Sequence, residues 1–235
     1  MSIKKLIKGL IVSLFLSSLL ASAGGLNKGL QALRTDDYAT ALSELTPKAE
    51  EGDAVAQLFL GNMYDFGMGV LQNDKTAADW YTKSAKQGNR AAQYSLGVMY
   101  ENGIGVLEND KTAADWYTKA AEQGHDYAQF NLALMYEYGG EGVLENDKTA
   151  AYWYRKAAEQ GQSSAQNNLG SMYRLGTGVL TDNRRAYMWY NLSSYNGFKT
   201  GGKNKDLMAK LMTPADISKA QEMSSRCLES NYTDC

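Results

Sequence analysis

The sequence predicts an all-α protein: an α/α solenoid, or superhelix, of about four αα-hairpin repeats with capping helices at both ends. The first observation behind this prediction is a block with a Trp-Tyr pair that recurs at Trp80, Trp116, Trp153 and Trp189, 36, 37 and 36 residues apart. A fixed period of this length is typical of stacked units rather than of one globular core. The second observation is that apolar residues within each block follow the helical period.

The first 23 residues resemble a secretory signal peptide in their order. Three lysines lie within the first eight residues, an apolar run follows over 10–20, and Ala21-Ser22-Ala23 supplies small residues for cleavage. The alternative is an uncleaved membrane anchor, but the run is short for a span of about 20 residues. We therefore expect a cleaved signal, a periplasmic or secreted location, and no transmembrane segment in the mature chain.

Residues 24–52 are predicted to form a degenerate half-repeat that caps the N-terminal end. Their apolar stripe consists of Tyr38, Ala41, Leu42 and Leu45. Four repeats follow over residues 53–88, 89–124, 125–161 and 162–197.

The first half of each repeat is predicted to be a helix with one buried face. In the second repeat, Ala92, Leu96, Met99 and Tyr100 follow the i, i+4, i+7, i+8 spacing of such a face. Gly97 lies in the middle of this helix, where glycine costs about 1 kcal/mol relative to alanine. The position is also small elsewhere, as Gly61, Ala133 and Gly170, so we expect a close approach by the partner helix.

A glycine-containing turn and a second helix complete each repeat. Gly103 and Gly105 are suited to positive φ after the first helix. The second helix is predicted to begin with an aspartate N-cap at Asp74, Asp110 and Asp147, and with Asn183 in the fourth repeat. The third repeat has one extra residue in its turn, which accounts for the longer period.

The recurring Trp-Tyr pairs have two interpretations. They are either core packing between hairpins or an aromatic platform for stacking or cation–π binding. We favour the core, because a residue used only for recognition does not need to recur in every repeat.

Residues 198–235 are predicted to form a C-terminal capping helix and a disulfide-closed tail. Thr213 and Pro214 are a suitable N-cap and first helical residue. Cys227 and Cys235 are expected to pair in an oxidising compartment, the alternative being two free thiols. The lysines between 199 and 210 are interpreted as part of a solvated loop.

The repeated residues resemble those of the Sel-one-like repeat family, a relative of the tetratricopeptide repeat. In the second repeat the resemblance is carried by Ala92, Leu96, Gly97, Tyr100, Gly103, Gly105, Val106, Asp110, Ala113, Trp116, Tyr117, Lys119, Ala120, Ala121 and Gly124. It covers residues 53–197, although the fourth repeat departs from the pattern after Tyr190. The resemblance implies a scaffold or adaptor for other proteins. Cysteine-rich secreted relatives are linked to β-lactam binding, but this chain lacks their repeat cysteines, so that activity is not carried over.

Charge and motifs argue against several other function classes. The formal charge is −2, and removing the three signal lysines makes the mature chain more acidic, whereas nucleic-acid binding needs a positive surface. His125 is the only histidine and is interpreted as a surface or capping residue. We find no catalytic, metal-binding or cofactor-binding motif and expect no enzyme activity.

The sequence identifies a candidate surface for another protein or peptide. By similarity to tetratricopeptide stacks, the first helix of each hairpin should line a concave face. The variable positions expected there form an apolar, aromatic groove with an acidic row: Leu58, Phe59, Asp65, Phe66, Tyr94, Val98, Glu101, Tyr127, Phe130, Leu134, Glu137 and Tyr138. The alternative is that about half of the apolar ones only pack against neighbouring helices.

The resulting hypothesis is an exported protein-interaction scaffold. The alternatives are an envelope-associated binder or hydrolase of small ligands or peptidoglycan fragments, and an immunity-type module encoded beside its partner.

Overall fold

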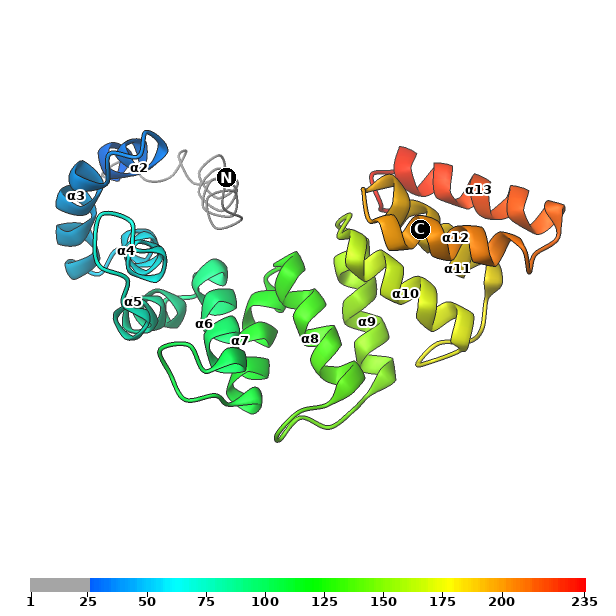
Figure 1. Cartoon of the computed structure of the whole chain (residues 1–235), viewed down its shortest axis with the longest axis horizontal. Helices are drawn as coiled ribbons and strands as arrows, with labels where there is room; N and C mark the ends of the chain where they lie inside the picture. The colour runs from blue at the N-terminus through cyan, green and yellow to red at the C-terminus, as the bar shows by residue number, and fades with distance from the viewer. Residues whose placement is uncertain (1–25) are drawn as a thin grey trace. The chain divides into compact units, whose positions relative to one another are not determined.

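The structure, a computed structural model, describes residues 26–235 and is built of helices (Figure 1). The predicted signal peptide, residues 1–23, lies outside the described residues. Twelve helices occur between residues 26 and 235, and the β-structure of this region is limited to one isolated bridge between Gly140 and Val143. None of these helices is long and apolar enough to cross a membrane. The all-α prediction is confirmed.

The chain divides into two compact units, with the boundary between Asn109 and Asp110. The described part of the first unit holds five helices, and each packs against the next along the chain. They are α2 (Asn27–Arg34), α3 (Tyr38–Glu50), α4 (Ala54–Phe66), α5 (Asp74–Lys86) and α6 (Arg90–Asn102).

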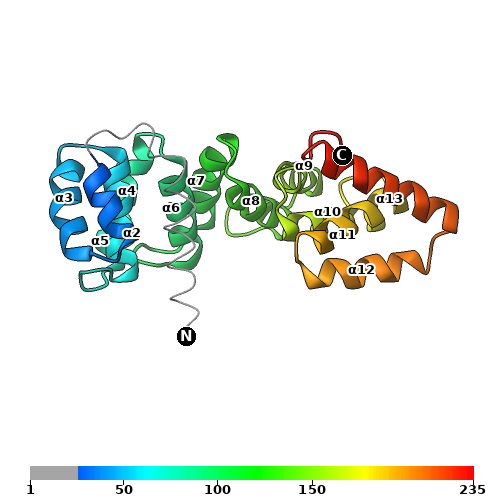
Figure 2. The same cartoon turned by 90° about the horizontal axis from the view of Figure 1, so that it is seen from above.

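The second unit continues the same pattern of consecutive packed helices up to its last hairpin, where both α12 and α13 pack against α11. Figure 2 shows α12 and α13 on either side of α11. The helices are α7 (Asp110–Glu122), α8 (Asp126–Tyr138), α9 (Asp147–Ala158), α10 (Ser163–Leu175), α11 (Asn183–Tyr195), α12 (Lys199–Ala209) and α13 (Pro214–Glu229).

Both ends of the chain contain more helix than the sequence predicted. The N-terminal segment forms a hairpin of α2 and α3. At the other end, the prediction of a solvated loop is wrong, because the lysine-rich segment forms α12. Gly201 explains this: a Cβ there would lie 2.7 Å from Cβ of Ser193, so the glycine lets α12 pack closely against α11.

The N-caps of three second helices lie one residue earlier than the sequence analysis placed them. Asn73, Asn146 and Asp182 are the N-caps of α5, α9 and α11, and the Asn73 side chain accepts a 3.0 Å hydrogen bond from the amide of Thr76. The prediction of Asp74, Asp147 and Asn183 as caps is therefore wrong. Helix α7 likewise starts at Asp110. The aspartates lie in the first turn, where a negative charge is favoured by the helix dipole.

The small residue inside each first helix has the predicted packing role. A Cβ at Gly61 would lie 2.6 Å from Cδ1 of Tyr81, and one at Gly170 would lie 2.9 Å from Cδ1 of Tyr190. These distances are too short for real contacts, so the tyrosine of the second helix fills the space that the glycine leaves. The expected close approach is confirmed.

The two aromatic residues of each pair have different environments. Tyr81, Tyr117, Tyr154 and Tyr190 are at most 1% exposed, and Trp189 is also buried. Trp80, Trp116 and Trp153 are only half-buried, so the core prediction holds for them in part: Trp80 and Trp153 pack against the buried core clusters. One residue along a helix rotates the side chain by about 100°, which turns these tryptophans toward solvent.

The half-buried tryptophans also meet cations. The ammonium of Lys83 lies 3.8 Å from the Trp80 ring centroid, and that of Lys119 lies 4.1 Å from the Trp116 ring centroid. The contacts join residues three apart on one helix face, so they contribute modestly to local stability.

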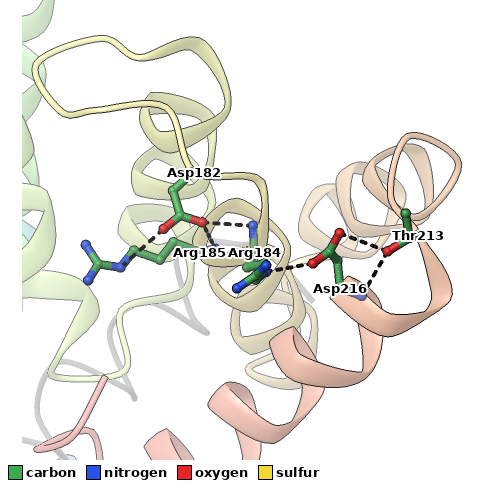
Figure 3. Close-up of polar contacts among 5 residues, drawn as sticks. All are labelled: Asp182, Arg184, Arg185, Thr213 and Asp216. Atoms are coloured by element: carbon green, nitrogen blue, oxygen red, sulfur yellow. Dashed lines mark hydrogen bonds and ion pairs between the residues drawn. The ribbon is translucent and has the colours of Figure 1, made fainter.

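Polar contacts hold α13 against α11 (Figure 3). Nε of Arg184 lies 2.8 Å from Oδ1 of Asp216, and the Thr213 hydroxyl donates to the other carboxylate oxygen at 2.8 Å. Thr213 also caps α13, as predicted. Cys227 and Cys235 form a disulfide that closes the tail, with their Cα atoms 4.7 Å apart.

Candidate functional site: a groove between α4 and α6

A groove of about 240 Å³ opens in the first unit, between the first helices of two consecutive repeats. Apolar side chains of α4 and α6 form most of its wall, and the second helix α5 contributes one tyrosine. The lining residues are Leu58, Asn62, Asp65, Phe66, Tyr81, Ala91, Tyr94, Ser95, Val98, Met99 and Ile104.

The Tyr81 hydroxyl organises the polar part of this wall. It lies 2.7 Å from Oδ1 of Asn62 and 3.1 Å from Oδ2 of Asp65, so one O–H group serves two acceptors. The ring reaches this position because Gly61 leaves space for it. The repeat glycine and tyrosine therefore fix the orientation of the acidic side chain in the groove.

Asp65 is the charged group at the groove. Burial raises the pKa of its carboxyl above the usual value of 3.8, and the negative charge of Asp74 adds to the increase, while the hydrogen bond from Tyr81 opposes it. Neither ion pair found among residues 26–109 involves Asp65. The ionised carboxylate is thus partly desolvated without a compensating cation, and a cation supplied from outside would stabilise it.

The contact between tyrosine and the first helix recurs in the second unit with different partners. The Tyr154 hydroxyl donates to Glu137, and the Tyr190 hydroxyl lies 3.0 Å from Oγ of Ser171. Asn168 donates to the Tyr154 hydroxyl from the next repeat at 3.0 Å. The sequence analysis missed this role of the acidic row. The available signal was the constant separation of 16 or 17 residues between acid and tyrosine.

The structure brings five of the twelve predicted surface residues together in the α4–α6 groove: Leu58, Asp65, Phe66, Tyr94 and Val98. Leu58 is 3% exposed and contributes to the floor of the groove, whereas the others are half-buried.

The remaining predicted residues lie elsewhere. Phe59 is 1% exposed and packs in the core, so its prediction as a binding residue is corrected. Phe130 and Leu134 pack against the core of the second unit, with the Phe130 ring 5.8 Å from that of Tyr154. Phe59 lies on the buried face of its helix, which repeats about every 3.6 residues, whereas Phe130 and Leu134 are partly buried. Outside the α4–α6 groove, Tyr127 and Tyr138 are exposed, and Glu101 and Glu137 are half-buried.

His125 has the capping role considered from the sequence, although it is buried. Its Nδ1 accepts a 3.3 Å hydrogen bond from the amide of Ala128 at the start of α8. Among residues 26–235, no group of three His, Cys, Asp or Glu side chains is placed to hold a metal ion.

The Sel1 repeat profile matches four consecutive segments, residues 54–89, 90–125, 126–162 and 163–198, which together make up more than half of the chain. The chain belongs to the Sel1 repeat family. Each of its four matched Sel1 repeats spans two consecutive helices of the sequence: α4 and α5, α6 and α7, α8 and α9, and α10 and α11. Proteins of this family generally mediate protein–protein interactions and are typically non-catalytic scaffolds.

Solved Sel1 repeat structures support the assignment. A Sel1 repeat protein from Oxalobacter formigenes is 36% identical, with a TM-score of 0.68, over 73% of this chain and 70% of that one. A Sel1 repeat protein from Klebsiella pneumoniae is 20% identical, with a TM-score of 0.50, over 84% of this chain and 99% of that one, and shows the fold alone. No match was found among curated proteins.

Proposed function

We propose that this Sel1 repeat protein is an exported scaffold whose α4–α6 groove binds a segment of another protein. The segment carries a lysine or arginine flanked by apolar side chains. The observation that carries the proposal is Asp65, a partly buried carboxylate that no cation of the described first unit neutralises, at the wall of an apolar groove.

The size of the groove suits side-chain anchors. Pockets for drug-sized ligands usually measure about 300–1,000 Å³, and this groove is smaller. It has room for one or two large side chains, which is how a few anchor residues dominate many protein interfaces. Apolar contacts with Leu58 and Val98 would supply affinity, and the pairing with Asp65 would supply selectivity.

Export is supported by two independent features. The first 23 residues have the order of a cleaved signal peptide. The Cys227–Cys235 disulfide is of the kind that persists in oxidising compartments such as the periplasm. A non-enzymatic role is supported by the family and by His125, the single histidine, which is used as a helix cap.

The matched pair of variants Asp65→Asn and Asp79→Asn tests the proposal. The asparagine oxygen at position 65 can still accept from Tyr81, so the variant removes the charge and keeps the hydrogen bond. Asp79 is exposed on α5 and lies outside the groove. The protein, tagged at its C-terminus, is expressed in the cells that export it, crosslinked and captured, and the captured partner is quantified by mass spectrometry.

We expect Asp65→Asn to reduce capture of the partner about tenfold, since a partly desolvated ion pair is worth more than an exposed one. Asp79→Asn should leave capture unchanged. Equal capture by both variants would refute the groove as the binding site, and recovery of sugars without any protein would favour a glycan-fragment binder instead.

A further inference from the structure

A second groove, of about 410 Å³, opens in the second unit between α10 and α12. One wall of the groove comes from α10 and α11, which belong to the fourth matched repeat. The other wall comes from α12 and the two residues that follow it, Lys210 and Leu211, which lie beyond the matched repeats. Its lining residues are Ser171, Arg174, Tyr190, Asn204, Leu207, Met208, Lys210 and Leu211.

This groove occupies the same position in the repeat as the α4–α6 groove. The first and fourth matched repeats start 109 residues apart, at 54 and 163. Adding this offset takes Asn62 to Ser171 and Tyr81 to Tyr190, and both residues of each pair line their groove. The same offset takes Ser95, on α6, to Asn204, on α12. Helix α12 therefore acts as the first helix of a fifth, degenerate repeat.

The charge at the equivalent wall position is reversed. Asp65 of the first groove corresponds to Arg174 of the second, and Lys210 adds a further cation to the same lining. Both side chains are exposed, and none of the ion pairs found between residues 110 and 235 involves either of them. The Tyr190 hydroxyl contacts the neutral Ser171 in place of a carboxylate.

Apolar surface lies beside these cations. Leu207 is 57% exposed and Leu211 is 73% exposed, while Met208, 1% exposed, forms part of the floor. A partner that covers these two leucines removes their apolar surface from water, which favours binding.

We propose that the α10–α12 groove is a second protein-binding site, and that it binds a partner segment in which an aspartate or glutamate lies next to a large aliphatic side chain. The carboxylate pairs with Arg174 and Lys210, and the aliphatic side chain packs on Leu207 and Leu211. The inference does not depend on the α4–α6 groove: the two sites select opposite charges, so one protein can hold two chemically different segments.

The test is an immobilised array of ten-residue peptides, in which four central positions combine Asp, Glu, Gln, Lys, Leu and Ser. The array is probed with the purified exported protein and with two double variants. Arg174→Glu with Lys210→Glu reverses the charge of the groove. Lys199→Glu with Lys203→Glu is the matched control, because both lysines are exposed on α12, lie outside the lining and change the net charge equally.

We expect the protein to bind peptides that combine an acid with leucine, and to prefer them to the Gln-Leu versions by about tenfold. The Arg174/Lys210 variant should lose this preference, the Lys199/Lys203 variant and Asp65→Asn should keep it, and added salt should weaken it. No preference for acidic-leucine peptides, or an equal loss in the two double variants, would overturn the proposal. All variants change exposed residues or keep their hydrogen bonds, so an unchanged thermal melt confirms that each one is folded.

Discussion

Removing one hydroxyl group, in the variant Tyr81→Phe, tests whether the repeat tyrosine holds the acidic wall of the α4–α6 groove. The ring stays in place and continues to fill the space above Gly61. The hydroxyl group is lost, together with its hydrogen bonds to Asn62 and Asp65 and its hydrogen bond with Ser95.

The expected magnitude follows from the two acceptors. A hydrogen bond to a neutral group contributes about 1 kcal/mol and one to a charged group about 1.5–3 kcal/mol, but a single O–H cannot deliver both in full. Asn62 is 6% exposed and has little access to a replacement donor, whereas Asp65 is half-buried and can turn toward solvent. We therefore expect Tyr81→Phe to lower the free energy of unfolding by about 1.5–2 kcal/mol.

Two further tyrosines calibrate the measurement. Tyr190→Phe loses a contact with the neutral Ser171 and should cost about 1 kcal/mol. Tyr195 is 71% exposed, so Tyr195→Phe should change stability by less than about 0.5 kcal/mol. Unfolding in urea, followed by circular dichroism at the helix signal, gives all three values. If Tyr81→Phe were as mild as Tyr195→Phe, the hydroxyl would not organise the groove, and the structural role assigned to it would be refuted.

Three other predictions concern the frame and the groove. Gly61→Ala should lower the free energy of unfolding, measured in urea, by about 1 kcal/mol. The added methyl group gains about 1 kcal/mol in helix propensity, but its overpacking against the Tyr81 ring costs more. A more stable variant would contradict the close packing. Tyr117→Ala should lower the free energy of unfolding by about 3–5 kcal/mol and Trp116→Ala by clearly less, since only the tyrosine is fully buried. Thermal melts that rank the two variants the other way would contradict the assignment of the tyrosine to the core. Binding of a cationic partner, measured by calorimetry, should weaken as pH drops through the raised pKa of Asp65. The midpoint of this loss of affinity should lie above pH 3.8, and the loss should be absent in Asp65→Asn. Affinity that does not depend on pH would exclude the Asp65 charge from recognition.

The sign of the pH effect on folding is opposite to its effect on binding. Because burial raises the pKa of Asp65 in the folded protein, its ionised form costs stability at neutral pH. This cost is relieved as pH falls through the folded pKa and the carboxyl takes up a proton. Acid should therefore weaken binding at this site while it removes the stability cost of the ionised Asp65.

The sequence was sufficient to predict the repeated hairpins, because their signals are local. Helical spacing of alanine and leucine identifies the buried faces, and Gly103 marks the end of a helix by requiring a left-handed backbone. The mid-helix Gly61 was also interpretable, since an unfavourable residue in a regular helix implies a packing reason.

Features that depend on long-range contacts were not predictable in the same way. The partner of Asp65 lies 16 residues away on another helix, so the helical period of α4 does not identify it, and only the recurrence of the acid–tyrosine separation in another repeat points to it. Trp116 and Tyr117 are adjacent in sequence, and only the orientation of the helix decides which one is buried. Helix α12 was missed because Gly201 and its neighbouring lysines have a loop-like composition, although the glycine serves close packing against α11.

Site-specific photo-crosslinking tests the central claim of a partner bound in the α4–α6 groove most directly. A photoreactive residue is placed at Val98, in the groove, or at Asp79, on the exposed face of α5, and the protein is irradiated in the cells that export it. We predict a discrete protein adduct from position 98 alone, with the crosslinked peptide carrying a lysine or arginine beside apolar residues. No adduct from position 98, or the same adduct from both positions, would contradict the account.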